Sequence, residues 1–136
     1  MGEPDGPFAA AAEPPPATQR LTQERIDAYA RASGDHNPIH LDPAAARAAG
    51  LPSTIAHGLL TLGVACARIE AWGGAEAWVQ RVSCRFAATV PAGEELTCRA
   101  RVASRDADQV TLELEVRIGS GEPALSRARA ELRRRA

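Results

Sequence analysis

Apolar and polar residues alternate along much of the C-terminal half of the chain. Four stretches place an apolar side chain at every second position: 81–86, 96–103, 110–118 and 127–132. A period of two gives each strand one buried face and one solvated face, which is typical of an antiparallel sheet. Short runs of turn-forming residues separate the stretches. The pattern therefore predicts four antiparallel strands.

The stretch before these strands is the most apolar part of the chain. Between residues 58 and 67 the only polar side chain is Thr61. A helix that is apolar on nearly all sides is a buried helix, and this one is shorter than the roughly 20 residues that span a bilayer. Such a helix followed by four antiparallel strands predicts an α+β domain. The economical packing is a curved antiparallel sheet wrapped around the central buried helix.

Two shorter helices are expected ahead of the buried one. Thr22 is a good N-cap for the first, and Gly34 is a good stop for it. Asp42, which a proline follows, predicts the start of the second. We expect residues 35–41 between them to form a loop, because Pro38 lacks the amide that a helix interior needs.

The N-terminal residues differ in composition from the rest. Residues 1–17 are mostly Ala, Pro, Gly and Glu, and three consecutive prolines favour an extended polyproline conformation. We predict a flexible tail over 1–17 and a single domain over 18–136. The start of the chain lacks the basic and apolar pattern of a secretory signal, so we expect a cytoplasmic protein.

Composition narrows the possible partners. The formal net charge is -1, with 45% hydrophobic and 24% charged residues, as in ordinary globular proteins. Nothing in this balance indicates binding to nucleic acid or to an acidic membrane. The three cysteines are odd in number and form no CxxC pair, so neither a disulfide framework nor a zinc knuckle is predicted.

Candidate chemistry is concentrated in the segment 33–40 and at the start of the buried helix. Asp35 and His40 are five positions apart, so one loop can bring both side chains to one point. A carboxylate and an imidazole together can hold a water molecule and move its protons. The amide of Gly58 lies where a helix leaves its first N–H groups free, and it can bind a carbonyl oxygen as negative charge develops there.

Two other interpretations are open for these residues. Asp35 and Asn37 belong to residue types that often serve only as turn formers. A metal site could also be assembled from Asp35 and the three histidines, His36, His40 and His57. No recognised zinc-binding string is present, and we predict neither a metal nor a cofactor.

The same segment carries a family resemblance. The string Gly-Asp-x-Asn-Pro-x-His at 34–40, followed by His-Gly at 57–58, resembles the hydratase motif of MaoC-like proteins. This family includes the R-specific enoyl-CoA hydratases, and the resemblance covers roughly residues 18–133. It implies a hot-dog fold and a homodimer or higher homo-oligomer, with an acyl thioester entering near the subunit interface.

The resemblance also implies roles for individual residues. Asp35 and His40 match the family's catalytic pair, and Gly58 matches the amide that holds the thioester carbonyl. Asn37 and His57 match the other motif positions, which we group with the substrate-binding residues. Asn37 is expected to support the loop, and His57 to belong to the helix start rather than to proton transfer.

One position departs from the family pattern. Cys66 stands where the family often has a small polar residue, about two turns into the buried helix.

The activity that the resemblance implies is reversible hydration of trans-2-enoyl-CoA to (R)-3-hydroxyacyl-CoA. No cofactor is expected, because the thioester already acidifies the α-carbon. Other functions stay open at this point: dehydration of thioesters on an acyl carrier protein, thioester hydrolysis, and a hot-dog subunit that binds acyl thioesters without catalysis. The sequence does not define the acyl chain length, the carrier or the pathway.

Overall fold

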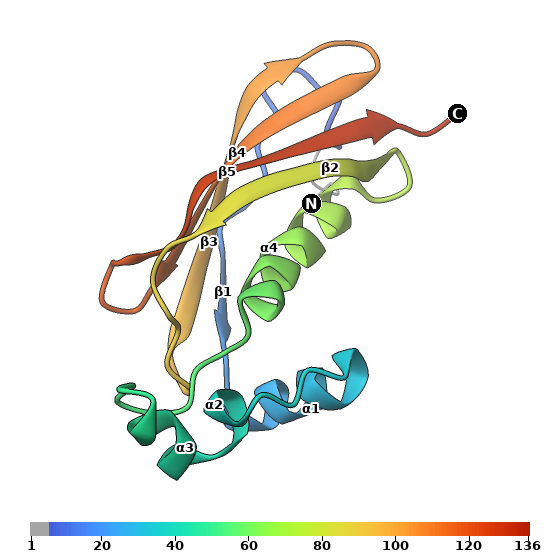
Figure 1. Cartoon of the computed structure of the whole chain (residues 1–136). Helices are drawn as coiled ribbons and strands as arrows, with labels where there is room; N and C mark the ends of the chain where they lie inside the picture. The colour runs from blue at the N-terminus through green and yellow to red at the C-terminus, as the bar shows by residue number, and fades with distance from the viewer. Residues whose placement is uncertain (1–5) are drawn as a thin grey trace.

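The computed structural model describes residues 6–136. Its helices and strands follow the chain in this order: β1 (Ala17–Arg20), α1 (Gln23–Ser33), α2 (Pro38–Leu41), α3 (Pro43–Ala48), α4 (Gly58–Gly73), β2 (Ala77–Phe86), β3 (Glu95–Arg105), β4 (Gln109–Ile118) and β5 (Pro123–Arg134). The strands form one sheet in the order β1-β3-β4-β5-β2, and every neighbouring pair is antiparallel. Helix α4 lies against one face of this sheet, and α1, α2 and α3 gather at one end (Figure 1).

The core lies between α4 and the inward side chains of the sheet. Val64 and Ala65 of α4 belong to one buried cluster with Leu96 of β3, and Ile69 belongs to a second cluster with Leu112 of β4. Full burial of an aliphatic side chain contributes about 1.5–3 kcal/mol. The α+β arrangement and the antiparallel sheet around a helix are thus confirmed. Within residues 6–136, none of the helices has the length and apolar character needed to cross a membrane.

The predicted loop over residues 35–41 is wrong for its second half. Residues Pro38–Leu41 form the short helix α2, with Asn37 as its N-cap. The Asn37 Oδ1 atom accepts a hydrogen bond from the Ile39 amide at 3.2 Å. Pro38 occupies the first helical position, where its missing amide would have had no helical partner. The predicted caps at Thr22, Gly34 and Asp42 are confirmed.

Strand β1 was not expected from the sequence. It pairs with β3 from Ala17↔Cys98 to Arg20↔Glu95, at the edge of the sheet. Four residues are too few to show a clear period of two, so only the pairing with β3 defines the strand.

The N-terminal segment (residues 6–16) lies along the sheet before β1. Arg105 Nε donates to the Pro7 carbonyl at 2.8 Å, and the Glu13 carboxylate accepts the Val102 amide at 2.9 Å. The first five residues of the predicted tail lie outside the described part of the chain, and the flexibility of the remainder stays a prediction.

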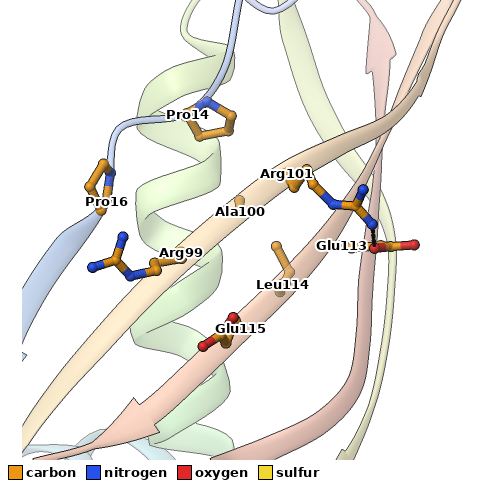
Figure 2. Close-up of a pocket in the computed structure, with 8 residues that line it drawn as sticks. All are labelled: Pro14, Pro16, Arg99, Ala100, Arg101, Glu113, Leu114 and Glu115. Carbon is orange, nitrogen blue, oxygen red and sulfur yellow. Dashed lines mark hydrogen bonds and ion pairs between the residues drawn. The ribbon is translucent and has the colours of Figure 1, made fainter.

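A hollow of about 380 Å³ lies between this segment and strands β3 and β4 (Figure 2). Its lining includes Pro14, Pro16 and the ion pair between Arg101 and Glu113. None of the residues that line it belongs to the candidate site.

Candidate active site

His40 is held in one orientation by a backbone carbonyl. Its ring is buried, and Nδ1 lies 2.7 Å from the carbonyl oxygen of Ile55. A carbonyl oxygen only accepts, so Nδ1 carries the hydrogen, and in the neutral form of the ring Nε2 keeps its lone pair. The ring lines a cavity of about 200 Å³. His40 is therefore fixed in the tautomer that leaves Nε2 as a proton acceptor.

Asp35 lies in the turn between α1 and α2. Its amide is held by Ser33 Oγ at 3.1 Å, and its Oδ1 atom accepts the Asn37 amide at 3.2 Å. Asp35 and Asn37 thus do act as turn formers, as the simpler interpretation expected. The Asp35 side chain is nevertheless exposed, and its second carboxylate oxygen takes no part in the turn. Turn formation and a catalytic role are compatible for Asp35.

His57 connects the two members of the predicted pair. Its Nε2 donates to the backbone carbonyl of Asp35 at 3.0 Å, and its ring stacks on His40 with centroids 3.8 Å apart. The His57 ring also contacts Tyr29, with ring centroids 4.6 Å apart and the planes inclined by 59°. Nitrogen or carboxylate oxygen atoms of Asp35, His40 and His57 all lie within 4.8 Å of one another. The structure thus brings together three of the five predicted site residues.

These three side chains are also a possible set of metal ligands. A metal bound to an imidazole lies in the plane of the ring, in line with the nitrogen lone pair. The planes of His40 and His57 are inclined by only 24° and are stacked, so a single ion cannot lie in both. His36, the third histidine, is exposed and is not among the three clustered side chains. This geometry is unfavourable to the metal alternative, and the absence of a metal stays a prediction.

Gly58 begins α4 and lines the same cavity as His40. The N-cap residue His57 makes no side-chain hydrogen bond to the first turn, so the amides there are free of a side-chain cap. A methyl group added at Gly58 would lie 3.0 Å from the Phe86 ring. The close approach of Phe86 therefore favours glycine here, independently of any substrate. Asp35, Asn37 and His57 do not line the cavity, so the catalytic role of Asp35 and the substrate-binding roles of Asn37 and His57 stay predictions.

Thr61 and Phe86 are among the cavity residues that were not predicted as site residues. Thr61 is buried in the second turn of α4, and Phe86 is 54% exposed at the end of β2. The sequence pattern could have indicated Thr61, since it is the only polar side chain in the apolar stretch 58–67. It could not have indicated Phe86, because its place in an alternating strand is typical of a core residue.

Cys66, the position that departs from the family pattern, is half-buried on α4. Burial raises the pKa of its thiol, and the carboxylate of Glu70 raises that pKa further. The thiol is therefore protonated at neutral pH, which makes Cys66 a poor nucleophile.

Comparison with solved structures identifies the fold. The (R)-hydratase from A. caviae involved in PHA biosynthesis superposes with a TM-score of 0.82 at 25% identity, covering 91% of this chain and 98% of that one. The unliganded R-hydratase PhaJ1 from Pseudomonas aeruginosa gives a TM-score of 0.83 at 26% identity, covering 93% and 83% of the two chains. The predicted hot-dog fold is confirmed.

Sequence comparison identifies the family. A peroxisomal hydratase-dehydrogenase-epimerase of Neurospora crassa is 34% identical over 130 residues, which are 90% of this chain and 14% of that protein. The 3-hydroxyacyl-thioester dehydratase X of Mycobacterium tuberculosis is 50% identical over 58 residues, which are 43% of this chain and 21% of that protein. The chain thus spans only a small part of these relatives. The family model for the MaoC-like domain matches residues 8–121, and the chain belongs to the MaoC-like dehydratase family.

Proposed function

We propose that this domain catalyses reversible hydration of a trans-2-enoyl thioester to an (R)-3-hydroxyacyl thioester. The observation that carries the proposal is the cluster of Asp35, His40 and His57, in which Ile55 fixes the proton-accepting tautomer of His40. The hydratases and dehydratases among the similar proteins support the reaction class, and the neighbours named as R-hydratases support the stereochemistry.

The chemistry requires two proton transfers. A water molecule held between the Asp35 carboxylate and His40 Nε2 attacks the β-carbon of the enoyl group. The pair takes one proton from this water and returns one proton to the α-carbon, so the protein ends unchanged. The proposed water contacts both groups, and we assign the two transfers to Asp35 and His40 together.

The Gly58 amide stabilises the intermediate charge. As the water oxygen bonds to the β-carbon, electron density moves onto the thioester oxygen, which becomes enolate-like. Hydrogen-bond donors that are already oriented toward such an oxygen stabilise the transition state more than the ground state. The uncapped first turn of α4 provides these donors next to the cavity. The thioester supplies the acidity of the α-carbon, so no cofactor is required.

A second copy of the chain is part of the proposal. Helix α4 is apolar around most of its circumference, but one chain covers only one side of it. An outward strip at helical spacing is exposed: Leu59, Gly63, Ala67 and Ala71. Strand β2 is also at the sheet edge, where Trp78 is 41% exposed. Unpaired edges and apolar faces are usually covered in native assemblies, and we expect a homodimer that covers both.

The experiment that tests the reaction class is a comparison of thioester substrates. Purified protein is mixed with crotonyl-CoA, and loss of the enoyl-thioester absorbance is followed together with release of free thiol. Hydration without thiol release, giving the (R)-alcohol, supports the proposal. Thiol release would indicate a thioesterase, and binding without turnover would indicate a non-catalytic subunit. A parallel assay with crotonyl-acyl carrier protein identifies the preferred carrier.

A further inference from the structure

The side-chain amide of Gln23 connects three segments behind His40. Gln23 is the first residue of α1, and its Nε2 atom donates to the backbone carbonyl of His40 and to Asp27 Oδ1, both at 2.8 Å. Its Oε1 atom accepts the hydroxyl of Thr54 at 2.6 Å. One amide thus ties α1 to the backbone of α2 and to the segment that precedes α4.

Thr54 is adjacent to the carbonyl that orients the catalytic imidazole. The next residue is Ile55, whose carbonyl accepts the His40 Nδ1–H at 2.7 Å. The Ile55 amide in turn donates to the Ile39 carbonyl at 3.2 Å. The ring of His40 therefore contacts the segment 54–55 directly, and the backbone of His40 is linked to the same segment through Gln23. A displacement of that segment moves the acceptor of the Nδ1 hydrogen bond.

We infer that Gln23 and Thr54 are positioning residues for His40. By fixing the segment 54–55 relative to α2, they hold the Ile55 carbonyl within hydrogen-bond distance of Nδ1. A shift of about 1 Å would lengthen that contact beyond a useful hydrogen bond. The ring would then be free to rotate or to carry its hydrogen on Nε2, which would remove the proton acceptor from the cavity.

This role acts through His40 and not through the substrate. Neither Gln23 nor Thr54 lines the cavity, and Thr54 is buried. Their loss is therefore expected to lower kcat and to leave KM nearly unchanged. Small displacements of a reacting group can reduce rates about 100-fold, so we expect a decrease of about 10–100-fold. The catalytic consequence rests on the proposed function, whereas the effect on the His40 tautomer does not.

The test compares variants that differ by one functional group. Thr54→Val removes the hydroxyl and keeps the shape, Thr54→Ser restores a hydroxyl, and Gln23→Met removes the amide. Thr18→Val, at an exposed position of β1, is the matched control. Each variant is assayed for kcat and KM with crotonyl-CoA. The ring nitrogens are also observed by NMR in ¹⁵N-histidine-labelled protein, with His40→Gln used to assign the His40 signals.

The inference predicts an Nδ1–H tautomer for His40 in the wild type, in Thr54→Ser and in Thr18→Val. In Thr54→Val and Gln23→Met it predicts a mixed or exchanging tautomer, with reduced kcat at unchanged KM. Folded Thr54→Val and Gln23→Met proteins with wild-type His40 signals would overturn it, whether or not the protein is a hydratase. If turnover is absent from the wild type but the tautomer changes as predicted, the proposed function fails and the positioning role stands.

Discussion

The imidazole rings of His40 and His57 stack with their centroids 3.8 Å apart and their planes inclined by 24°. The two rings nevertheless have different hydrogen-bond partners. His40 donates through Nδ1 to Ile55, and His57 donates through Nε2 to the backbone of Asp35. The Nδ1 atom of His57 is buried and has no partner among the described residues. His40 thus lines the cavity, and His57 holds the turn at Asp35 next to the His40 ring.

This difference predicts unequal effects of the same substitution at the two histidines. Glutamine keeps an N–H donor but cannot exchange a ring proton. His40→Gln is expected to lower kcat by about 10²–10⁴-fold, the usual loss for a general acid–base residue. His57→Gln should cost clearly less, because its amide can still hold the Asp35 carbonyl. Steady-state kinetics of both variants check this, and equal losses would show that His57 also transfers protons.

Gly58→Ala is expected to impair turnover without unfolding the protein. The added methyl group would lie 3.0 Å from the Phe86 ring and beside the amide that is proposed to hold the thioester oxygen. We predict a decrease in kcat/KM of at least about tenfold, comparable with loss of part of an oxyanion contact.

The double variant Gly58→Ala with Phe86→Ala separates the two causes. Recovery of activity would show that the defect comes from the contact with Phe86. A persistent defect would show that the methyl group interferes with the substrate. A fully active Gly58→Ala enzyme would contradict the proposed role of this helix start.

Cys66 is expected to be unreactive at neutral pH. Because burial and the Glu70 carboxylate raise the pKa of its thiol, little thiolate exists until the pH exceeds the ordinary cysteine range. Alkylation by iodoacetamide at pH 8, followed by peptide mass spectrometry, should be slower at Cys66 in the folded protein than in the urea-unfolded chain. An equal or faster rate in the folded state would show that the thiol is activated.

The outward strip of α4 predicts a dimer that a charge should disrupt. Leu59→Glu would place a carboxylate on this strip, at a side chain that is 63% exposed in one chain. Light scattering should give a dimer for the wild type and a monomer of low activity for Leu59→Glu. Ala28→Glu, at an exposed position of α1, is the control and should remain dimeric. A wild type that is monomeric and fully active would refute the interface.

The fold was predictable where the pattern is long and regular. The nine alternating residues 110–118 in β4 predict a strand, and the stretch of α4 with Thr61 as its only polar side chain predicts a buried helix. Helix α2 was not predictable, because Pro38 suits a loop and a first helical position equally, and the Asn37 cap decides between them. Strand β1 depends on β3, about 80 residues further along the chain.

The candidate site was likewise predictable only in part. Asp35 and His40 are close in sequence and carry distinctive side chains, so their pairing could be anticipated. The Ile55 carbonyl that orients His40 belongs to a backbone that every residue has, and it therefore leaves no sequence signal. The contact between Gln23 and Thr54 joins residues 31 positions apart and exists only after α1 and α4 are placed.

The most direct test of the account is the rate of crotonyl-CoA hydration by Asp35→Asn. The side chain is exposed and asparagine keeps an oxygen that can accept the Asn37 amide, so the fold should survive. Asp42→Asn, which preserves the cap of α3 away from the cluster, is the matched control and should retain activity. We predict that Asp35→Asn lowers kcat by about 10²–10⁴-fold. A folded Asp35→Asn protein that keeps more than about a tenth of wild-type activity would contradict the assignment of Asp35 to proton transfer.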